Sequence, residues 1–93
     1  MCDNHVHPHE DTRRIVNRIA RAAGHLTAIS QMIEEGRDCS EVLIQLAAVR
    51  SAVNNIGKLI INDHMAHCIT AAMENGDQDA LRQFADAMNI YLK

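Results

Sequence analysis

The longest stretch of the sequence without a helix-breaking signal runs from Asp38 to Asn75–Gly76, and no other feature limits the fold as strongly. Apolar residues recur along it at steps of three and four, the spacing of one face of an α-helix. They are Val42, Leu46, Val49, Val53, Ile56 and Ile60. Gly57 interrupts the pattern, but one glycine costs a helix only about 1 kcal/mol relative to alanine. We therefore predict one helix from about residue 39 to about residue 74.

A helix of this length does not fit inside a compact chain of 93 residues. About 35 residues at the helical rise span on the order of 50 Å, whereas a compact domain of this size has a radius of gyration of roughly 12 Å. Part of the helix must therefore protrude with its apolar face uncovered. Pairing with a second copy about a two-fold axis is the commonest way to cover such a face, so we predict at least a homodimer.

Two shorter helices flank the long one, and no segment alternates as a β-strand does. Before it, helical spacing begins at Thr12 and stops at Gly36, a residue typical of a helix end. The apolar residues of this segment are Ile15, Ile19, Ala22, Leu26, Ile29 and Ile33. After it, Asp77 or Asp79 is placed to cap a third helix. Its apolar residues are Leu81, Phe84, Ala85, Met88 and Leu92. The predicted fold class is all-α, with three helices per chain.

Three soft metal ligands lie on the long helix: Cys39, His64 and Cys68. His64 and Cys68 are four residues apart and so share a helix face, but Cys39 precedes His64 by 25 residues, roughly 37 Å along a helix. Two antiparallel copies bring Cys39 of one chain beside His64 and Cys68 of the other. Two thiolates and an imidazole suit Cu(I), and a fourth ligand such as His7 would also permit Zn(II) or Ni(II). The alternative is that the cysteines simply fill the core.

The first eleven residues differ from the rest of the chain. They hold His5, His7, His9 and the only proline, Pro8, and we predict an arm over residues 1–11 and one helical domain over residues 12–93. The arm is polar and acidic, unlike a signal peptide, and no run approaches the ~18 apolar residues of a membrane span. A cytoplasmic protein without membrane contact is the expectation, and cysteines in that compartment are more often ligands or reactive thiols than disulfide partners.

A basic row marks the first helix, although the formal net charge of the chain is -3. Arg14, Arg18, Arg21 and His25 follow one another at steps of four, three and four. Arginine rows favour phosphate contacts, so the row is a candidate nucleic-acid surface that Arg50 could extend in a dimer. A solvated arginine face is the alternative.

The same residues are compatible with two other classes of protein function. A metal-storage or chaperone protein would use the same ligands without needing the arginines, and a thiol-redox switch would link Cys39 and Cys68 covalently. We do not expect an enzyme, because the sequence holds no Ser–His–Asp set, glycine-rich phosphate loop or recognisable pair of catalytic carboxylates.

Over residues 12–93 the sequence resembles the copper-sensing operon repressor family (CsoR/RcnR), which also has formaldehyde- and persulfide-sensing members. Four stretches carry the resemblance: NRIARAAGHLTAISQMIEEGRDCSEVLIQLAAVRSAV, NNIGKLI, DHMAHC and AMNIYLK. The resemblance implies an all-α homotetramer, a dimer of antiparallel dimers, that binds double-stranded operator DNA and leaves it when the site is filled or modified. It implies derepression of metal efflux or detoxification genes.

The resemblance also assigns residues. Cys39, His64 and Cys68 match the metal-site spacing of the copper sensors, which makes Cu(I) the first expectation. His7 falls where nickel- and cobalt-sensing members carry an N-terminal histidine ligand, which makes Ni(II) the alternative. Persulfide-sensing members lack a histidine at the position of His64, and formaldehyde-sensing members lack the second cysteine. Arg18 and Arg21 match family residues implicated in DNA contact, with Arg14 and Arg50 as additions; His25 departs from the glutamine that the family often has there.

Overall fold

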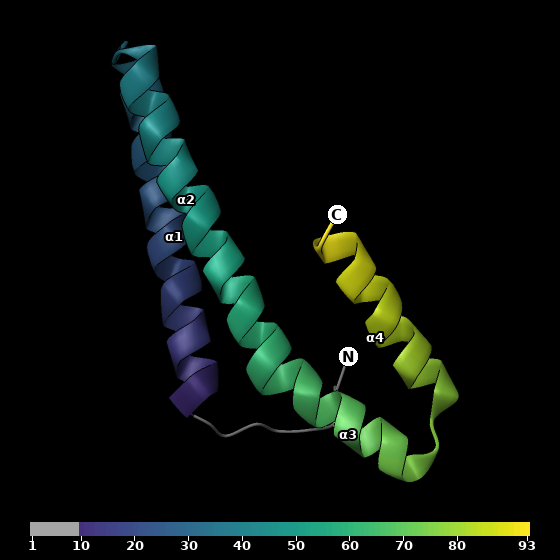
Figure 1. Cartoon of the computed structure of the whole chain (residues 1–93). Helices are drawn as coiled ribbons and strands as arrows, with labels where there is room; N and C mark the ends of the chain where they lie inside the picture. The colour runs from purple at the N-terminus through teal and green to yellow at the C-terminus, as the bar shows by residue number, and fades with distance from the viewer. Residues whose placement is uncertain (1–9) are drawn as a thin grey trace. The chain divides into compact units, whose positions relative to one another are not determined.

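The structure, a computed structural model, describes residues 10–93, and within that range every regular element is a helix. In chain order these are α1 (Glu10–Glu34), α2 (Cys39–Leu59), the π-helix η1 (Ile60–Met65), α3 (Ala66–Asn75) and α4 (Gln78–Tyr91) (Figure 1). Because α2, η1 and α3 follow one another in the sequence without a break, residues 10–93 form three helical stretches. The predicted all-α class with three helices is confirmed, although the first helix begins at Glu10, two residues before the predicted start at Thr12. No helix in residues 10–93 combines the length and apolar character that crossing a membrane requires.

The chain divides into two compact units. The hairpin unit contains α1 and α2 and ends at Leu59, and the C-terminal unit begins at Ile60 and contains η1, α3 and α4.

Two glycines end helices in the left-handed conformation that L side chains rarely adopt. Gly36 has a φ of 73° and Gly76 a φ of 68°. At each, the amide of the following residue donates to a carbonyl five residues back, Arg37 to Met32 at 3.0 Å and Asp77 to Ala72 at 2.8 Å. The glycine amides donate to carbonyls three residues back. Both turns are therefore Schellman motifs, which pair the last carbonyls of α1 and α3.

α1 and α2 pack against each other as an antiparallel hairpin through a heptad-like seam, the set of residues that each helix turns toward the other (Figure 1). The most buried seam residues are Ile15 and Ile29 of α1 and Val49 and Ile56 of α2, all at most 7% exposed. Half-buried residues continue the seam at steps of three and four: Ala22, His25 and Met32 on α1, and Val42, Gln45, Ala52 and Leu59 on α2. This spacing is the one by which two helices interlock side chains along a common line.

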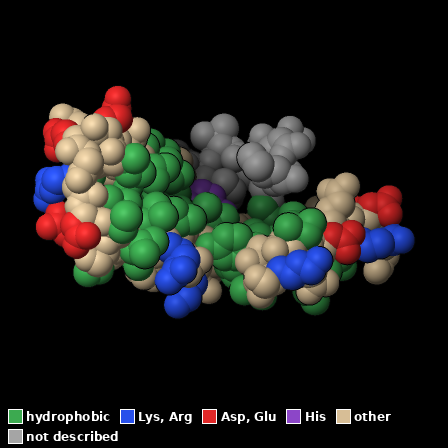
Figure 2. Space-filling model, turned by 90° about the horizontal axis from the view of Figure 1, so that it is seen from above, with side chains coloured by type: hydrophobic (Ala, Val, Ile, Leu, Met, Phe, Trp, Pro, Cys, Tyr) green, Lys and Arg blue, Asp and Glu red, His purple; other side chains and the backbone are tan. Residues whose placement is uncertain are grey.

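A second apolar row on each helix of the hairpin unit is exposed. On α1 it consists of Val16, Ile19, Leu26 and Ile33, between 48% and 61% exposed. On α2 it consists of Leu43, Leu46 and Val53, between 43% and 65% exposed, with Ile44 beside it at 68%. Figure 2 shows hydrophobic side chains gathered on the part of the molecule that the hairpin occupies. The apolar residues that predicted the first helix therefore divide between the seam and this exposed row, which holds Ile19, Leu26 and Ile33.

In the C-terminal unit, α3 packs against both η1 and α4. Cys68 and Ala72, each 6% exposed, are its most buried residues. Asp77 caps α4 as predicted, since its carboxylate accepts a hydrogen bond of 3.1 Å from the Ala80 amide.

The long helix changes type in the middle, a feature that the sequence spacing did not predict. Helical structure extends from Cys39 to Asn75, close to the predicted bounds, but residues Ile60–Met65 form a π-helix. A π-helix closes its hydrogen bonds over one more residue than an α-helix does and occurs preferentially at functional sites. Its last turn contains His64.

Candidate functional site

His64 and Cys68 lie in the C-terminal unit, one helical turn apart across the junction between η1 and α3. Cys68 is 6% exposed and His64 is half-buried, with its Nε2 atom shielded from solvent. Their spacing of four residues places both on one side of the helix. His67, the residue before Cys68, is exposed.

Cys39 lies in the hairpin unit and is the first residue of α2. It is exposed and its thiol is free. Asp38 and Glu41 flank it with the spacing of a capping box, but their side chains bond elsewhere. The Asp38 carboxylate accepts from the Ser40 hydroxyl, and Glu41 pairs with Arg37 at 2.9 Å. Cys39 thus begins a helix at an exposed turn, and the two neighbouring carboxylates bond to Ser40 and Arg37.

The structure does not gather the predicted metal ligands within one chain. Among residues 10–93, no group of three or more His, Cys, Asp or Glu side chains is placed to hold a metal ion. Cys39 belongs to the hairpin unit, and His64 and Cys68 belong to the C-terminal unit. The predicted fourth ligand, His7, lies outside the described residues, as do Cys2, His5 and His9.

The donor set nevertheless fits a transition metal that prefers sulfur and nitrogen. Two cysteine sulfurs and one imidazole are the ligands chosen by Cu(I), and with a further nitrogen they suit Zn(II) or Ni(II). The His64 Nε2 atom, which is shielded from solvent, is a nitrogen donor of the kind that this set includes. One half of the set, His64 and Cys68, is present on a single helical segment, and the other half, Cys39, is presented outward.

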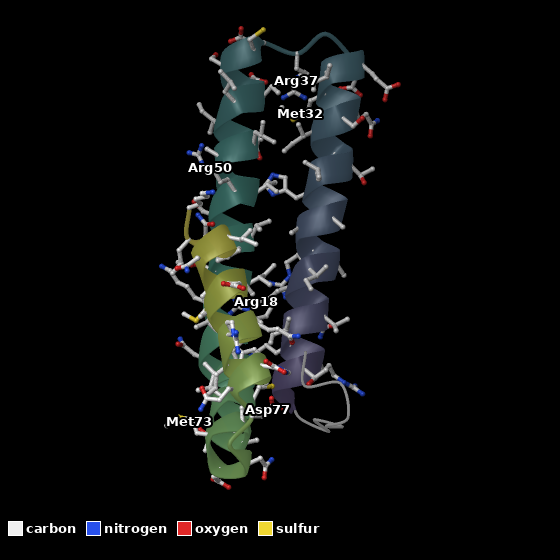
Figure 3. The ribbon with its side chains drawn as sticks, turned by 90° about the vertical axis from the view of Figure 1, so that its right-hand side faces the viewer. Arg18, Met32, Arg37, Arg50, Met73 and Asp77 are labelled. Atoms are coloured by element: carbon white, nitrogen blue, oxygen red, sulfur yellow. The ribbon has the colours of Figure 1, made fainter. Side chains whose placement is uncertain are left out.

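The arginines predicted to contact nucleic acid are all exposed. Arg14, Arg18 and Arg21 lie on α1 at steps of four and three, and Arg13 is exposed beside them. Arg50 is exposed on α2 and projects from the side of that helix away from α1 (Figure 3).

His25 behaves differently from the arginines with which the sequence grouped it. It is half-buried in the hairpin seam, and its Nε2 lies 2.7 Å from Oε1 of Gln45 on α2. Sequence reasoning did not identify Gln45. The available signal was its place in the row Val42, Gln45, Val49, where a polar residue interrupts an apolar line at heptad spacing.

Comparisons with known proteins agree on one group. Residues 11–90 match the family model described as metal-sensitive transcriptional repressor. The copper-sensing transcriptional repressor CsoR of Bacillus subtilis (strain 168) is 32% identical over 81 residues, which cover 86% of this chain and 80% of that protein.

Two solved structures are also similar to this chain. The nickel-responsive transcriptional regulator InrS is 41% identical and superimposes with a TM-score of 0.72, covering 94% of this chain and 99% of that one. The copper-sensing repressor CsoR with Cu(I) from Geobacillus thermodenitrificans NG80-2 is 27% identical with a TM-score of 0.82, covering 90% of this chain and 88% of that one. The family match includes Cys39, His64, Cys68 and every exposed arginine of α1 and α2 discussed above.

Proposed function

Since the chain belongs to the family of metal-sensitive transcriptional repressors, we propose that it binds double-stranded operator DNA when metal-free and leaves it when metal binds. The proposed metal is Cu(I), held by Cys39 of one subunit and by His64 and Cys68 of another. The proposed assembly is a homotetramer built from two antiparallel dimers. Release from DNA would permit transcription of metal efflux genes.

The observation that carries the proposal is the division of the ligands. Cys39 is presented outward at the start of α2, whereas His64 and Cys68 lie past its end. The 21 residues of α2 span roughly 31 Å at the helical rise. A second chain running antiparallel places its own His64 and Cys68 at the end where Cys39 of the first chain lies. A two-fold axis then creates two equivalent sites.

The exposed apolar rows of the hairpin unit support the same assembly. Eight large apolar side chains on α1 and α2 are at least 43% exposed in the single chain. Monomeric proteins rarely expose apolar patches that are contiguous over more than a few hundred Å². The rows have the heptad spacing that a second hairpin can interlock with, which produces a four-helix bundle.

DNA binding is proposed to use the exposed arginines, chiefly Arg18 and Arg21, with Arg14 and Arg50 as further contacts. Guanidinium groups pair with phosphate oxygens in a bidentate manner and position a protein on the duplex without reading its sequence. The two-fold assembly doubles the row and extends the contact along the DNA.

The hairpin provides the route from metal to DNA. Bound metal would join the start of α2 in one subunit to the η1–α3 junction of another. Because α1 packs along α2, a constraint on Cys39 also acts on the helix that carries the arginines. A coupling free energy of about 1–3 kcal/mol would lower DNA affinity by about 5- to 150-fold.

Ni(II) is a second candidate metal, favoured by a specific observation. Identity to the nickel-responsive regulator InrS is 41%, against 32% and 27% to the two copper sensors described above. In the proposed Ni(II) site, His7 supplies a fourth ligand and completes a four-coordinate set of nitrogen and sulfur atoms, which Ni(II) accepts.

One experiment tests the proposal and separates the two metals. Fluorescence anisotropy of a labelled fragment from the protein's own promoter region is followed anaerobically with reduced protein. Cu(I), Ni(II) and Zn(II) are then added in turn under a competing chelator. Release by Cu(I) that is lost in Cys39→Ala and kept in His7→Ala supports the copper site. Release by Ni(II) that is lost in both variants supports the nickel site.

A neighbouring substitution serves as control. Ser40→Ala alters the same exposed turn without removing a proposed ligand, so it should respond to metal as the unaltered protein does. Metal-triggered release that survives Cys39→Ala would contradict the shared site. Absence of DNA binding in every state would leave the storage and redox alternatives.

A further inference from the structure

A hydrogen bond between side chains joins the two helices within the hairpin seam, and it involves a titratable group. His25 Nε2 and Gln45 Oε1 lie 2.7 Å apart, with both residues half-buried. Along the same seam on either side, the residues are apolar: Ala22 and Ile29 on α1, and Val42 and Val49 on α2. A polar pair in an apolar seam fixes the register of the two helices at some cost in stability.

The geometry determines which imidazole nitrogen carries the hydrogen. Gln45 Oε1 is a carbonyl oxygen and only accepts, so His25 Nε2 must donate. In the neutral imidazole Nδ1 then lacks a hydrogen, and it is the atom that a further proton joins. Protonation therefore keeps the bond to Gln45 and makes its donor charged, which strengthens the bond. The added proton therefore does not break the hydrogen bond that joins α1 to α2.

The surroundings of His25 determine what that charge does. On α1 the charged residues nearest along its row are Arg21 and Arg18, four and seven residues earlier and both exposed. On α2 the seam positions around Gln45 are uncharged. The nearest acid on that helix, Glu41, is engaged with Arg37 at 2.9 Å. A proton on His25 thus extends the basic row of α1 by one positive charge.

We propose that His25 is a proton-dependent positioning residue of the DNA-binding surface, held in register by Gln45 and strengthening DNA binding when it is protonated. The inference rests on the proposed function and adds proton linkage to it. The sign follows from electrostatics, because DNA phosphates close to α1 favour the charged imidazole. Binding to DNA then takes up protons, so DNA affinity rises as the pH falls.

The test compares three proteins in the metal-free, reduced state at constant ionic strength. For the unaltered protein we expect DNA affinity to rise about three- to tenfold between pH 8 and pH 6. His25→Gln keeps a side chain that can bond Gln45 but cannot take up a proton, so its DNA affinity should change less than about twofold between pH 8 and pH 6. Gln45→Leu removes the acceptor and should weaken binding at both pH values while retaining the pH dependence. His67→Gln, which changes an exposed histidine of α3, should keep the full pH dependence.

The outcomes are distinguishable. Full pH dependence in His25→Gln would overturn the assignment of the proton to His25, and unchanged affinity in Gln45→Leu would overturn the positioning role. If the unaltered protein binds DNA tightly with no pH dependence, this inference fails and the proposed function stands. If it binds no DNA at either pH, both fail. Circular dichroism of each variant establishes that the helices are retained.

Discussion

Cys39 and Cys68 belong to one proposed ligand set but occupy opposite environments: the first is exposed at the start of α2, and the second is 6% exposed within α3. In reduced, metal-free protein we expect iodoacetamide to modify Cys39 faster than Cys68, because alkylation requires an accessible thiolate. Bound metal should slow modification of both cysteines together. Mass spectrometry of timed digests measures the two rates. Protection of Cys68 alone would argue against a shared site.

The exposed apolar row of α1 predicts the effect of a charge on assembly. Leu26 is 49% exposed in the single chain, so Leu26→Glu should cost the isolated hairpin little. In the proposed four-helix bundle the same glutamate would be buried without a partner, which is costly. We expect sedimentation velocity to show loss of the tetramer and the appearance of smaller species. Thr27→Glu, a change at the next exposed residue, is the control and should leave the assembly intact.

Salt dependence tests the arginine row. Removal of a phosphate contact lowers the affinity for all DNA sequences. It also lowers the steepness of the plot of log affinity against log salt concentration by about one per contact removed. Arg18→Ala and Arg21→Ala should therefore each weaken DNA binding and flatten the plot of log affinity against log salt. The matched control is Arg82→Ala on α4, where the guanidinium pairs with Asp79 at 3.2 Å. An unchanged salt slope in both α1 variants would place the DNA contact elsewhere.

Two glycines should respond oppositely to replacement by alanine. Gly76 has a φ of 68°, so Gly76→Ala should lower the free energy of unfolding by about 1 kcal/mol or more because alanine is strained there. Gly24 lies within α1, and an added Cβ would meet no atom within 4 Å in the single chain. Gly24→Ala should raise the free energy of unfolding by about 0.5–1 kcal/mol through helix propensity. Urea unfolding at a fixed protein concentration measures both, and equal signs would contradict the prediction.

The sequence predicted the helices well because their signals are local. Spacings of three and four residues identified them, and Gly36, Gly76 and Asp77 marked ends that the structure confirms. The π-helix was not predicted, since nothing in the composition of Ile60–Met65 distinguishes it from an α-helical segment. It arises from backbone hydrogen bonding rather than from a residue type.

The sequence also did not predict which apolar residues of α1 are covered by α2 and which are exposed. Ile15 and Ile29 face α2, whereas Ile19 and Leu26 are exposed, yet all four obey helical spacing. Periodicity identifies a broad apolar side of a helix but does not reveal which half is covered by the same chain. The candidate ligands could be identified from the sequence because their residue types and their spacing along the helix are local signals. Their gathering remains a prediction, because it depends on a second copy.

The two apolar rows of the hairpin have a consequence for how much of this protein a cell must hold. If the exposed apolar rows of α1 and α2 are covered only by another copy, folding is tied to association by mass action. The melting temperature should then rise with protein concentration, and dilution alone should unfold the chain. Newly made subunits would be vulnerable to proteases until they meet a partner, so a repressor of this kind would have a lower limit of abundance set by its own fold.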